Sequence, residues 1–272
     1  MSKKLIVEIG QDLQSAGGGP VVYLEGKTDP PILLALLGAS GERETSRGVL
    51  YQGVLIRGLD PGGSSAVEQR LRVAREAKSA GIFGVLDGDG RPLRELIPEF
   101  DGPHAGPQFR WKGFCIENLL ARATWPEPWG VMPDWRAVLT DFAPYVAINR
   151  LRLELSGRLQ RLDLSGSREP NYGRPLVTRQ AFIDKLRAGK HELAGLEIEA
   201  MFSAELDSFL ATLEGSVDEA QAVLNGKWLV DVFASQRMKR TQAQCRDEWT
   251  AYLRSIGGDP EIKAWWGRTF AR

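Results

Sequence analysis

Acidic side chains follow two short apolar segments in the first third of the chain. Glu25 comes directly after Val21–Leu24, and an Asp-Gly-Asp-Gly sequence at 87–90 follows the apolar run that ends at Leu86. Carboxylates that lie close together raise one another's pKa or need a cation to neutralise them. Because the chain has only two histidines and two cysteines, oxygen ligands beside glycines favour Mg²⁺ or Mn²⁺ over zinc. Asp-Gly-Asp-Gly alone is more typical of a turn, but Glu25 after the earlier segment favours the metal interpretation.

Other motifs that bind phosphate or calcium fit these residues less well. Gly-Lys-Thr at 26–28 resembles the end of a nucleotide-binding P-loop, but the glycine required five positions earlier would fall at Val21. An EF-hand beginning at Asp87 would need an acid or amide at Arg91 and a glutamate at Pro98. The sequence contains no Gly-x-Ser-x-Gly elbow for an acyl-transfer serine. With these motifs set aside, the acidic residues are best interpreted as a site for phosphoryl chemistry on metal ions.

The first half of the sequence predicts alternating strands and helices. Three short apolar runs are typical of buried strands: 21–24, 49–56 and 81–86. Between them, Asp29 is the expected N-cap of a helix that runs through Leu37, and a capping box at 65–68 begins another helix. This alternation predicts an α/β fold with a parallel sheet covered by helices on both faces. The carboxyl ends of parallel strands meet at one edge, so the acids that follow the strands are expected there together.

The second half is predicted to be mainly helical. Apolar residues recur at three- and four-residue spacing in five segments: 135–145, 179–186, 192–213, 221–238 and 242–256. Interruptions by Gly, Ser and Pro at 156–175 indicate a loop or hairpin insertion. The Trp-Pro-Glu-Pro-Trp stretch at 125–129 cannot continue a helix. We therefore expect a first domain over residues 1–125 and a mainly helical domain over 126–272.

Charge and composition limit the partners and the cellular compartment that the sequence predicts. The 272 residues include 35 basic and 35 acidic side chains, so net charge provides no general attraction to nucleic acid or membrane. Seven arginines accompany three acids over 150–179, and eight acids occur without Lys or Arg over 192–219, although either stretch alone is more typical of a solvated face. No apolar run approaches the roughly 20 residues of a membrane span, and the N-terminus lacks a signal core. With two widely spaced cysteines, the sequence predicts a soluble, cytoplasmic protein.

Four short motifs, in order along the chain, resemble those of a TOPRIM nuclease domain. They are Leu-Glu-Gly-Lys-Thr-Asp at 24–29, Val-Leu-Asp-Gly-Asp-Gly at 85–90, Phe-Cys-Ile-Glu-Asn-Leu-Leu at 114–120 and Asn-Gly-Lys at 225–227. The chain resembles the overcoming-lysogenization-defect branch and, more narrowly, stand-alone TOPRIM effectors encoded beside an ABC-type ATPase in anti-phage systems such as PARIS. The resemblance implies a TOPRIM, Rossmann-like sheet, mainly parallel and flanked by helices, as the catalytic domain over 1–125.

The resemblance assigns roles to the acids of these motifs. It implies that Glu25 is a metal ligand or proton-transfer group and that Asp87 and Asp89 are metal ligands. Asp29 is implied to support a metal or its water, although capping the following helix is an equally good alternative. Glu117 is implied to add a further carboxylate, the alternative being an exposed glutamate at a helix start.

Basic residues are implied to act on the phosphate. Lys227 would stabilise charge that develops there during the reaction, the alternative being a lysine on a helix surface. Trp111 is a candidate for lining the substrate path, although a buried tryptophan is the commoner role. We expect structural roles for His104, His191, Cys115 and Cys245. The candidate contacts to nucleic acid are Lys27, Arg91, Lys112, Arg150 and Arg152.

The expected activity is metal-dependent hydrolysis of phosphodiester bonds with one or two Mg²⁺ or Mn²⁺ ions. DNA and RNA both remain open as substrates, including an unstacked loop such as that of a tRNA. The family precedent implies a toxic anti-phage effector that a partner ABC-type ATPase holds and releases, with the acidic stretch 192–219 as the candidate docking surface. Homodimerisation through the helical half is expected by analogy.

Two alternatives belong to other functional classes. The first is a TOPRIM module that binds nucleic acid or regulates without cutting, although such a relic need not keep all three of Glu25, Asp87 and Asp89. The second is a primase- or topoisomerase-like transferase. That enzyme would need a nucleophilic tyrosine domain or a zinc-binding module, neither of which the sequence shows.

Overall fold

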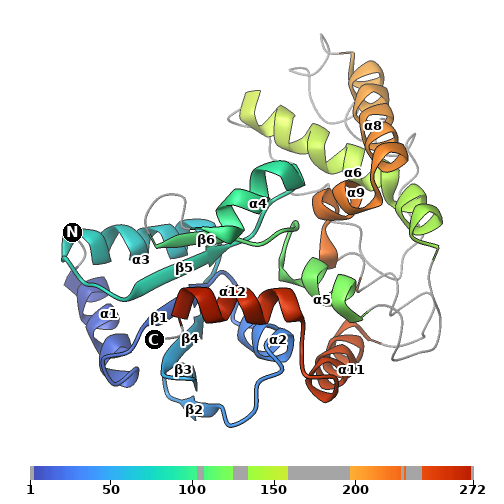
Figure 1. Cartoon of the computed structure of the whole chain (residues 1–272). Helices are drawn as coiled ribbons and strands as arrows, with labels where there is room; N and C mark the ends of the chain where they lie inside the picture. Colours follow the sequence, from blue (N-terminus) through green and yellow to red (C-terminus); the bar gives the residue numbers. More distant parts are fainter. Residues whose placement is uncertain are drawn as a thin grey trace.

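The computed structural model describes residues 3–102, 107–124, 134–158, 197–227, 230 and 241–270. Within them a six-stranded sheet lies between layers of helices, as Figure 1 shows. The strand order is β2-β3-β4-β1-β5-β6. Strands β4, β1, β5 and β6 run parallel, whereas β2 and β3 extend the sheet in antiparallel fashion. The strands are β1 Val21–Leu24, β2 Arg43–Thr45, β3 Gly48–Tyr51, β4 Val54–Gly58, β5 Ile82–Leu86 and β6 Gln108–Arg110.

The described segments also contain helices, most of which cover the two faces of the sheet. In chain order they are α1 Lys3–Ser15, α2 Asp29–Leu36, α3 Ser64–Glu76, α4 Leu93–Asp101, α5 Ile116–Thr124, α6 Trp135–Arg158, α8 Ile198–Gly215, α9 Val217–Val223, α11 Gln242–Ser255 and α12 Pro260–Phe270. The mostly parallel sheet with helices on its faces confirms the α/β fold class. None of the helices in these ranges is both long and apolar enough to cross a bilayer.

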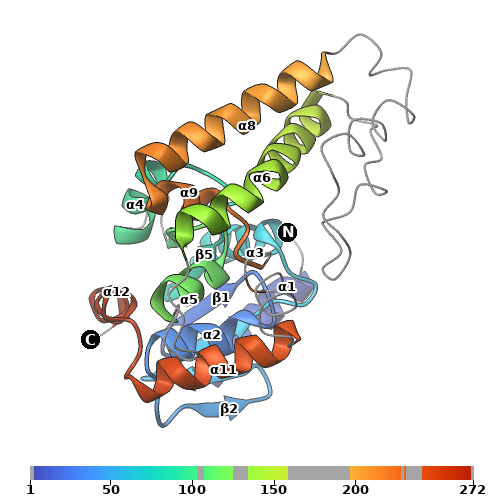
Figure 2. The same cartoon turned by 90° about the vertical axis from the view of Figure 1, so that its right-hand side faces the viewer.

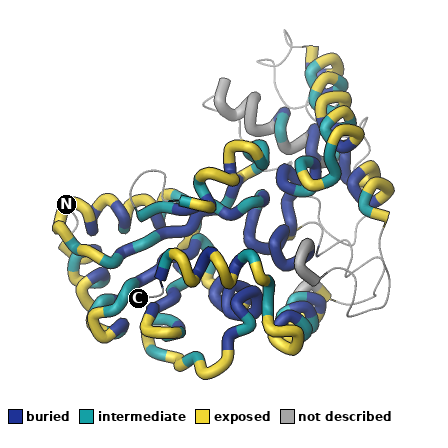
Figure 3. The backbone as a smooth tube through the Cα atoms, in the orientation of Figure 1, coloured by how far each residue is buried: buried dark blue, intermediate teal, exposed yellow. Residues whose placement is uncertain are grey.

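Two apolar clusters sandwich the sheet. Val21 and Tyr23 face α1 and α3 in one cluster, while Val22 and Leu24 face α2, α11 and α12 in the other. This alternation follows from the two-residue period of a strand. Because both faces are covered, all four residues of β1 are buried, and α2 is buried along almost its whole length (Figure 3).

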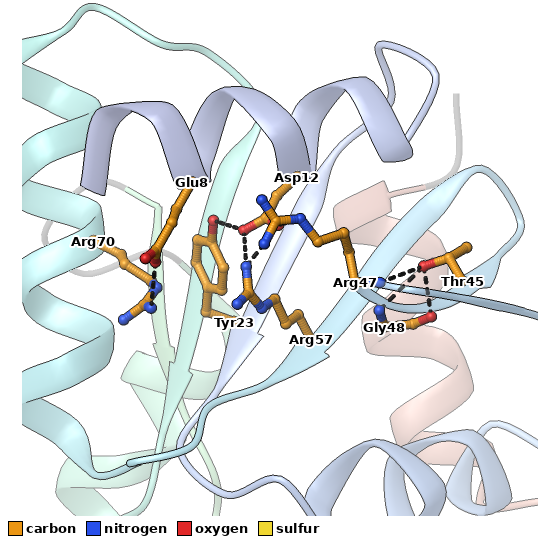
Figure 4. Close-up of polar contacts among 8 residues, drawn as sticks. All are labelled: Glu8, Asp12, Tyr23, Thr45, Arg47, Gly48, Arg57 and Arg70. Atoms are coloured by element: carbon orange, nitrogen blue, oxygen red, sulfur yellow. Dashed lines mark hydrogen bonds and ion pairs between the residues drawn. The ribbon is translucent and has the colours of Figure 1, made fainter. Parts of the chain in front are cut away.

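A buried polar cluster joins α1 to the sheet. Asp12 on α1 is fully buried and accepts a hydrogen bond of 2.7 Å from the Tyr23 hydroxyl. Arg57 Nη1 donates to the same carboxylate at 2.6 Å, and Arg47 Nε lies 3.4 Å from it (Figure 4). Since a buried carboxylate is stable only when paired and hydrogen-bonded, these partners explain why an aspartate is tolerated beneath the helix.

The prediction of one strand over 49–56 is wrong. Gln52 and Gly53 form a turn between β3 and β4, and their φ angles are 48° and 77°. Positive φ at two successive residues is the geometry of a two-residue hairpin turn. The apolar residues on both sides concealed this turn. The strands at 21–24 and 82–86 are confirmed, whereas β2 and β6, of three residues each, were not predicted.

Two predicted helix starts also need correction. Thr28, not Asp29, is the N-cap of α2, and Asp29 is the first helical residue. Gly63 is the N-cap of α3 and makes no side-chain capping hydrogen bond, so the capping box of Ser65 and Glu68 is wrong. Both helices themselves are confirmed.

The described helices after residue 134 form two groups, one with its own apolar cluster and one that packs on the sheet. Helices α6, α8 and α9 enclose their own apolar cluster, which includes Leu139, Phe142 and Phe209. Figure 2 shows α6 and α8 side by side, extending away from the sheet. Helices α11 and α12 instead return to the sheet, where Trp249 and Trp265 join its core.

Several sequence predictions concern this later region. The expected helices at 135–145, 192–213 and 242–256 correspond to α6, α8 and α11. The boundary at 125–129 and the helix at 179–186 lie outside the described residues, as does most of the insertion at 156–175. The prediction of one helix over 221–238 is wrong at its start, because α9 ends at Val223 and Leu224 is its extended C-cap. Most of the rest of that segment lies outside the described residues.

Candidate active site

Glu25 and Asp87 meet where two adjacent strands end. Strands β1 and β5 are parallel neighbours with Leu24 paired to Val85, so the residues after each strand leave the sheet at the same edge. The backbone N–H of Asp87 donates a hydrogen bond of 2.8 Å to Glu25 Oε1. The structure thus brings together acids from two motifs that lie 62 positions apart.

The loop at 87–90 is held against the segment that leads into α5. The backbone N–H groups of Gly88 and Asp89 donate to the carbonyl oxygens of Gly113 and Phe114, both at 3.1 Å. A Cβ on residue 88 would lie 2.2 Å from the Gly113 oxygen, so this approach requires glycine. Asp89 has a φ of 50° and is exposed. The loop therefore presents Asp89 to solvent beside the half-buried Asp87.

Asp29 lies buried at the start of α2. Its Oδ2 accepts a hydrogen bond of 2.7 Å from the backbone N–H of Gly26. A Cβ at position 26 would lie 2.6 Å from Asp29 Oδ1, so the glycine after Glu25 lets this carboxylate fold back over the loop. The capping alternative is therefore replaced by a contact to the loop that carries Glu25.

Glu117 is the most enclosed acid of the site. It is the second residue of α5 and is fully buried, which excludes the alternative of an exposed glutamate. Among the described residues neither of its carboxylate oxygens has a hydrogen-bond partner. The Arg246 guanidinium on α11 lies with Nη2 3.6 Å from Oε1, and the charge of Glu117 also acts on Lys227.

Asn118 fixes the segment that precedes Lys227. Its Nδ2 donates hydrogen bonds of 2.8 Å to the carbonyl oxygens of Gln221 and Leu224. Its Oδ1 accepts from the backbone N–H groups of Cys115 at 3.0 Å and Gly226 at 3.2 Å. One side chain on α5 thereby holds the Asn-Gly-Lys motif beside the acids, and the exposed Lys227 extends from that motif.

The carboxylates of the site raise one another's pKa. Burial, followed by the charges of Glu25 and Asp29, raises the pKa of Asp87 to about 9. Burial and the charge of Glu117 raise the pKa of Asp29 to about 6. Burial also raises the pKa of Glu25, although the hydrogen bond from the Asp87 backbone opposes the shift and Asp89 reinforces it. Asp87 therefore lies within electrostatic reach of Glu25, Asp29 and Glu117, and Glu25 lies within reach of Asp89.

Lys227 is the cation that these acids share. Burial lowers the pKa of its ammonium group, but the charges of Glu117, Asp87 and Asp29 outweigh that effect and raise the pKa above its usual value. Conversely, Lys227 lowers the pKa of Glu25, Asp29 and Asp87. The site thus combines a cluster of carboxylates with a lysine whose positive charge acts on several of them.

The donor chemistry of the cluster fits a hard divalent cation. Burial and mutual repulsion leave three carboxylates with raised pKa values, and a cation would remove that repulsion. Carboxylate oxygens are preferred ligands of Mg²⁺, and Glu117 adds two buried oxygens that accept no hydrogen bond from any described residue. Within the described ranges, no three His, Cys, Asp or Glu side chains are arranged so that they could hold a metal ion together.

Two residues that the sequence analysis did not single out, Glu99 and Arg110, hold the acidic loop at 87–90 in place. Arg110 at the end of β6 donates from Nη1 to the carbonyl oxygen of Asp87 at 2.8 Å, and its Nε lies 2.9 Å from Glu99 Oε2. Glu99 also accepts two hydrogen bonds from Arg91, at 2.7 and 2.9 Å. Glu99 therefore links Arg91, which follows the loop at 87–90, to Arg110 at the end of β6. The signal available in the sequence was two arginines flanking an acid-rich helix, which is too common to identify the contact.

The predicted contacts to nucleic acid are engaged with carboxylates. Lys27 Nζ lies 3.0 Å from Asp60, and Arg91 is held by Glu99. Lys112 Nζ lies 2.6 Å from Glu261 on α12, and Arg150 Nη1 lies 3.6 Å from Glu205 on α8. Of these, only Lys27 is largely exposed, at 68% of its side chain. The side chain of Arg152 lies outside those described.

The remaining residues singled out in the sequence are structural or outside the described ranges. Trp111 is 1% exposed and packs edge-on against Trp265 in the core, which is the commoner role for tryptophan. Cys115 and Cys245 are buried and form no disulfide. His104 and His191 lie outside the described residues.

Comparison with known proteins adds no assignment to this geometry. No protein-family model, curated protein or solved structure matches the chain.

Proposed function

We propose that this chain is a metal-dependent nuclease that hydrolyses phosphodiester bonds of nucleic acid. The observation that carries the proposal is the meeting of Glu25 with the Asp87 backbone at the ends of two parallel strands, with a hydrogen bond of 2.8 Å. The charge of Lys227 lowers the pKa of Glu25, Asp29 and Asp87, and the charge of Glu117 raises the pKa of Lys227. Partly buried acids with perturbed pKa values are typical of functional sites. The four motifs that resemble those of TOPRIM nucleases supply these same residues, which supports the choice of reaction.

Each residue has a role that its position allows. Glu25, Asp87 and Asp89 would hold the divalent cation, with Asp29 and Glu117 as further oxygen donors. When bound, Mg²⁺ or Mn²⁺ supplies Lewis acidity and lowers the pKa of a bound water. Lys227, which is exposed beside these acids, supplies positive charge to the phosphate as negative charge develops on it.

The substrate and partner follow from the resemblance. We propose RNA, including a tRNA loop, or DNA as the substrate, and a partner ABC-type ATPase as the regulator of a toxic anti-phage effector. The exposed acids Glu197, Glu199 and Asp207 at α8 are the candidate docking surface. Within the same stretch, Glu205 pairs with Arg150, and Glu219 accepts a hydrogen bond from the Leu93 backbone N–H. Charge reversal at the three exposed acids should weaken binding of the ATPase, and unchanged binding would remove this docking surface.

Cleavage assays test the proposed activity. The purified chain is incubated with DNA and with total RNA in the presence of Mg²⁺, Mn²⁺ or EDTA. Cleavage should require the cation, and Glu25→Ala or Asp87→Ala should reduce it by about 10²-fold or more, a typical loss for a catalytic group. Glu68→Ala, on the exposed surface of α3, is the matched control and should keep full activity.

The outcomes separate the proposal from its main alternative. Full cleavage by either Glu25→Ala or Asp87→Ala would refute the site. Binding of nucleic acid without cleavage, under every cation tested, would instead support a non-cleaving TOPRIM module. Circular dichroism of each variant shows whether the fold is intact.

A further inference from the structure

The carboxylate of Glu117 has no hydrogen-bond partner in an otherwise well-bonded site. Its side chain is 1% exposed, and neither oxygen accepts a hydrogen bond of standard geometry from any residue in the described ranges, although Glu117 interacts with the Cys115 thiol and raises its pKa. By contrast, Glu25 and Asp29 each accept a hydrogen bond from a backbone N–H. An ionised carboxylate buried in this way is costly unless a positive charge lies close to it. The charge close to Glu117 therefore decides how stable the site is without a cation.

Besides Lys227, on which the charge of Glu117 acts, Arg246 supplies positive charge to Glu117 from a different part of the chain. It lies on α11, which packs against α2 and α5, the helices that carry Asp29 and Glu117 (Figures 1 and 2). Its Nη2 lies 3.6 Å from Glu117 Oε1, and its Nε has no hydrogen-bond partner among the described residues. A separation of 3.6 Å is too long for a hydrogen bond, but it retains most of the Coulomb attraction. The pair is therefore held by charge rather than by a fixed bonding geometry.

This loose pairing makes the guanidinium replaceable. The side chain of Arg246 is 19% exposed, so it has a path to solvent that Glu117 lacks. A divalent cation that binds Glu117 would compete with Arg246 for the same oxygens, because both are attracted by the same negative charge. The positive charge of Arg246 would also repel the arriving cation.

We infer that the Arg246 guanidinium is a counter-charge of Glu117 while no divalent cation is bound, and that binding of a cation displaces this guanidinium. This inference rests on the proposed function. Arg246 is thus a positioning residue that sets the affinity of the site for divalent cations. It offsets the negative charge of the buried Glu117 carboxylate and so stabilises the site in the cation-free protein. It also weakens cation binding, because the cation must compete with it.

Calorimetric titration of the full chain with Mn²⁺ at neutral pH and low salt tests this inference. Arg246→Gln removes the charge, so Mn²⁺ should bind about fivefold or more tightly than to the wild type, a typical coupling between two bound charges. Arg246→Lys keeps the charge and should bind Mn²⁺ much as the wild type does. Arg254→Gln is the matched control on the same helix, because Arg254 pairs with the surface residue Glu42, and it should leave the affinity unchanged.

Thermal unfolding gives a second readout that does not depend on activity. In EDTA, Arg246→Gln leaves the Glu117 charge without its partner and should lower the melting temperature by about 5 °C. Saturating Mn²⁺ should remove most of that difference. The same comparison also shows directly whether the variant folds.

The possible results separate this inference from the proposed function. Equal or weaker Mn²⁺ binding by Arg246→Gln, with wild-type binding intact, would overturn the inference and leave the metal site standing. A Lys variant that behaves like the Gln variant would also overturn it, because packing rather than charge would then be the cause. Absence of Mn²⁺ binding by the wild type would remove the metal site itself and, with it, this role for Arg246.

Discussion

Asn118 Oδ1 accepts a hydrogen bond from the backbone N–H of Gly226, a residue 108 positions later in the chain. A Cβ at position 226 would lie 2.5 Å from the Asn118 backbone nitrogen, so the contact also requires glycine there. This relationship fixes the Asn-Gly-Lys motif on the helix that carries Glu117. The position of Lys227 therefore depends on an amide side chain that is not itself charged.

Replacing Asn118 should destabilise the protein and misplace Lys227. Asn118→Leu removes the partners of four backbone groups, and buried unsatisfied groups cost about 1–3 kcal/mol each. Because some of these groups will find water, we expect a loss of about 2–4 kcal/mol in the free energy of unfolding, measured by urea denaturation. Gln69→Leu, on the exposed surface of α3, is the control and should change stability by less than about 0.5 kcal/mol. Equal stability of the two variants would show that Asn118 holds nothing in place.

The raised pKa of Asp87 predicts a pH dependence of stability in EDTA. The folded pKa is about 9 and the unfolded value is about 4, so the folded state retains the proton more strongly. The resulting stabilisation is complete below about pH 4 and is lost as pH rises toward 9. Above about pH 6 this loss comes mainly from Asp87, because Asp29, with a pKa of about 6, has already titrated.

Asp87→Asn should therefore flatten the stability profile. Between about pH 6 and 9, the wild type should lose stability relative to the variant by on the order of 1 kcal/mol per pH unit. Urea denaturation at several pH values in EDTA measures both curves. Parallel curves would show that Asp87 has an ordinary pKa in the folded protein.

Gly26 should not tolerate a side chain. In Gly26→Ala the new Cβ would collide with the Asp29 carboxylate, which lies 2.6 Å from that position, and the hydrogen bond to the Gly26 backbone would be lost. We expect a cost of about 1–3 kcal/mol. Gly10→Ala on α1 is the opposite control, because nothing lies within 4 Å of its Cβ. It should stabilise the helix by about 0.5–1 kcal/mol. Stabilisation by both substitutions would mean that Asp29 does not fold back over the loop.

Glu99 should matter more than its neighbour Glu95. Glu99 is 16% exposed and bridges Arg91 and Arg110, whereas Glu95 is 47% exposed and contacts Arg91 alone at 3.3 Å. Glu99→Ala leaves both guanidinium groups without this partner and should cost about 1–3 kcal/mol in unfolding free energy. Glu95→Ala should cost less than about 0.5 kcal/mol, as an exposed ion pair does. Equal costs would indicate that the bridge does not hold the loop.

The strands and the acids at their ends could be predicted because their signals are local. Val21–Leu24 and 82–86 are continuous apolar runs, and the acids follow them directly. The turn at Gln52 and Gly53 escaped prediction because apolar residues continue on both sides of it. The predicted capping box at Ser65 and Glu68 was wrong because both residues lie inside α3, whose N-cap is Gly63.

The residues that hold the site in place could not be predicted from local patterns. Asn118, Glu99 and Arg246 act through partners that are distant in the sequence or separated from them by intervening elements. The same reason explains why Lys27 and Lys112 are predictable as basic residues but not as partners of Asp60 and Glu261. Ion pairs between distant residues depend on how helices and strands pack together, and the spacing of residues along the sequence does not reveal that packing.

We propose that the acids at the ends of β1 and β5 bind a hard divalent cation together. Electron paramagnetic resonance of Mn²⁺ measures this directly, because the signal of free Mn²⁺ falls as the ion binds. We predict that the wild-type chain depletes the free signal and that the double variant Glu25→Gln/Asp87→Asn does not, although circular dichroism shows it folded. Identical titration curves for the two proteins would contradict the account.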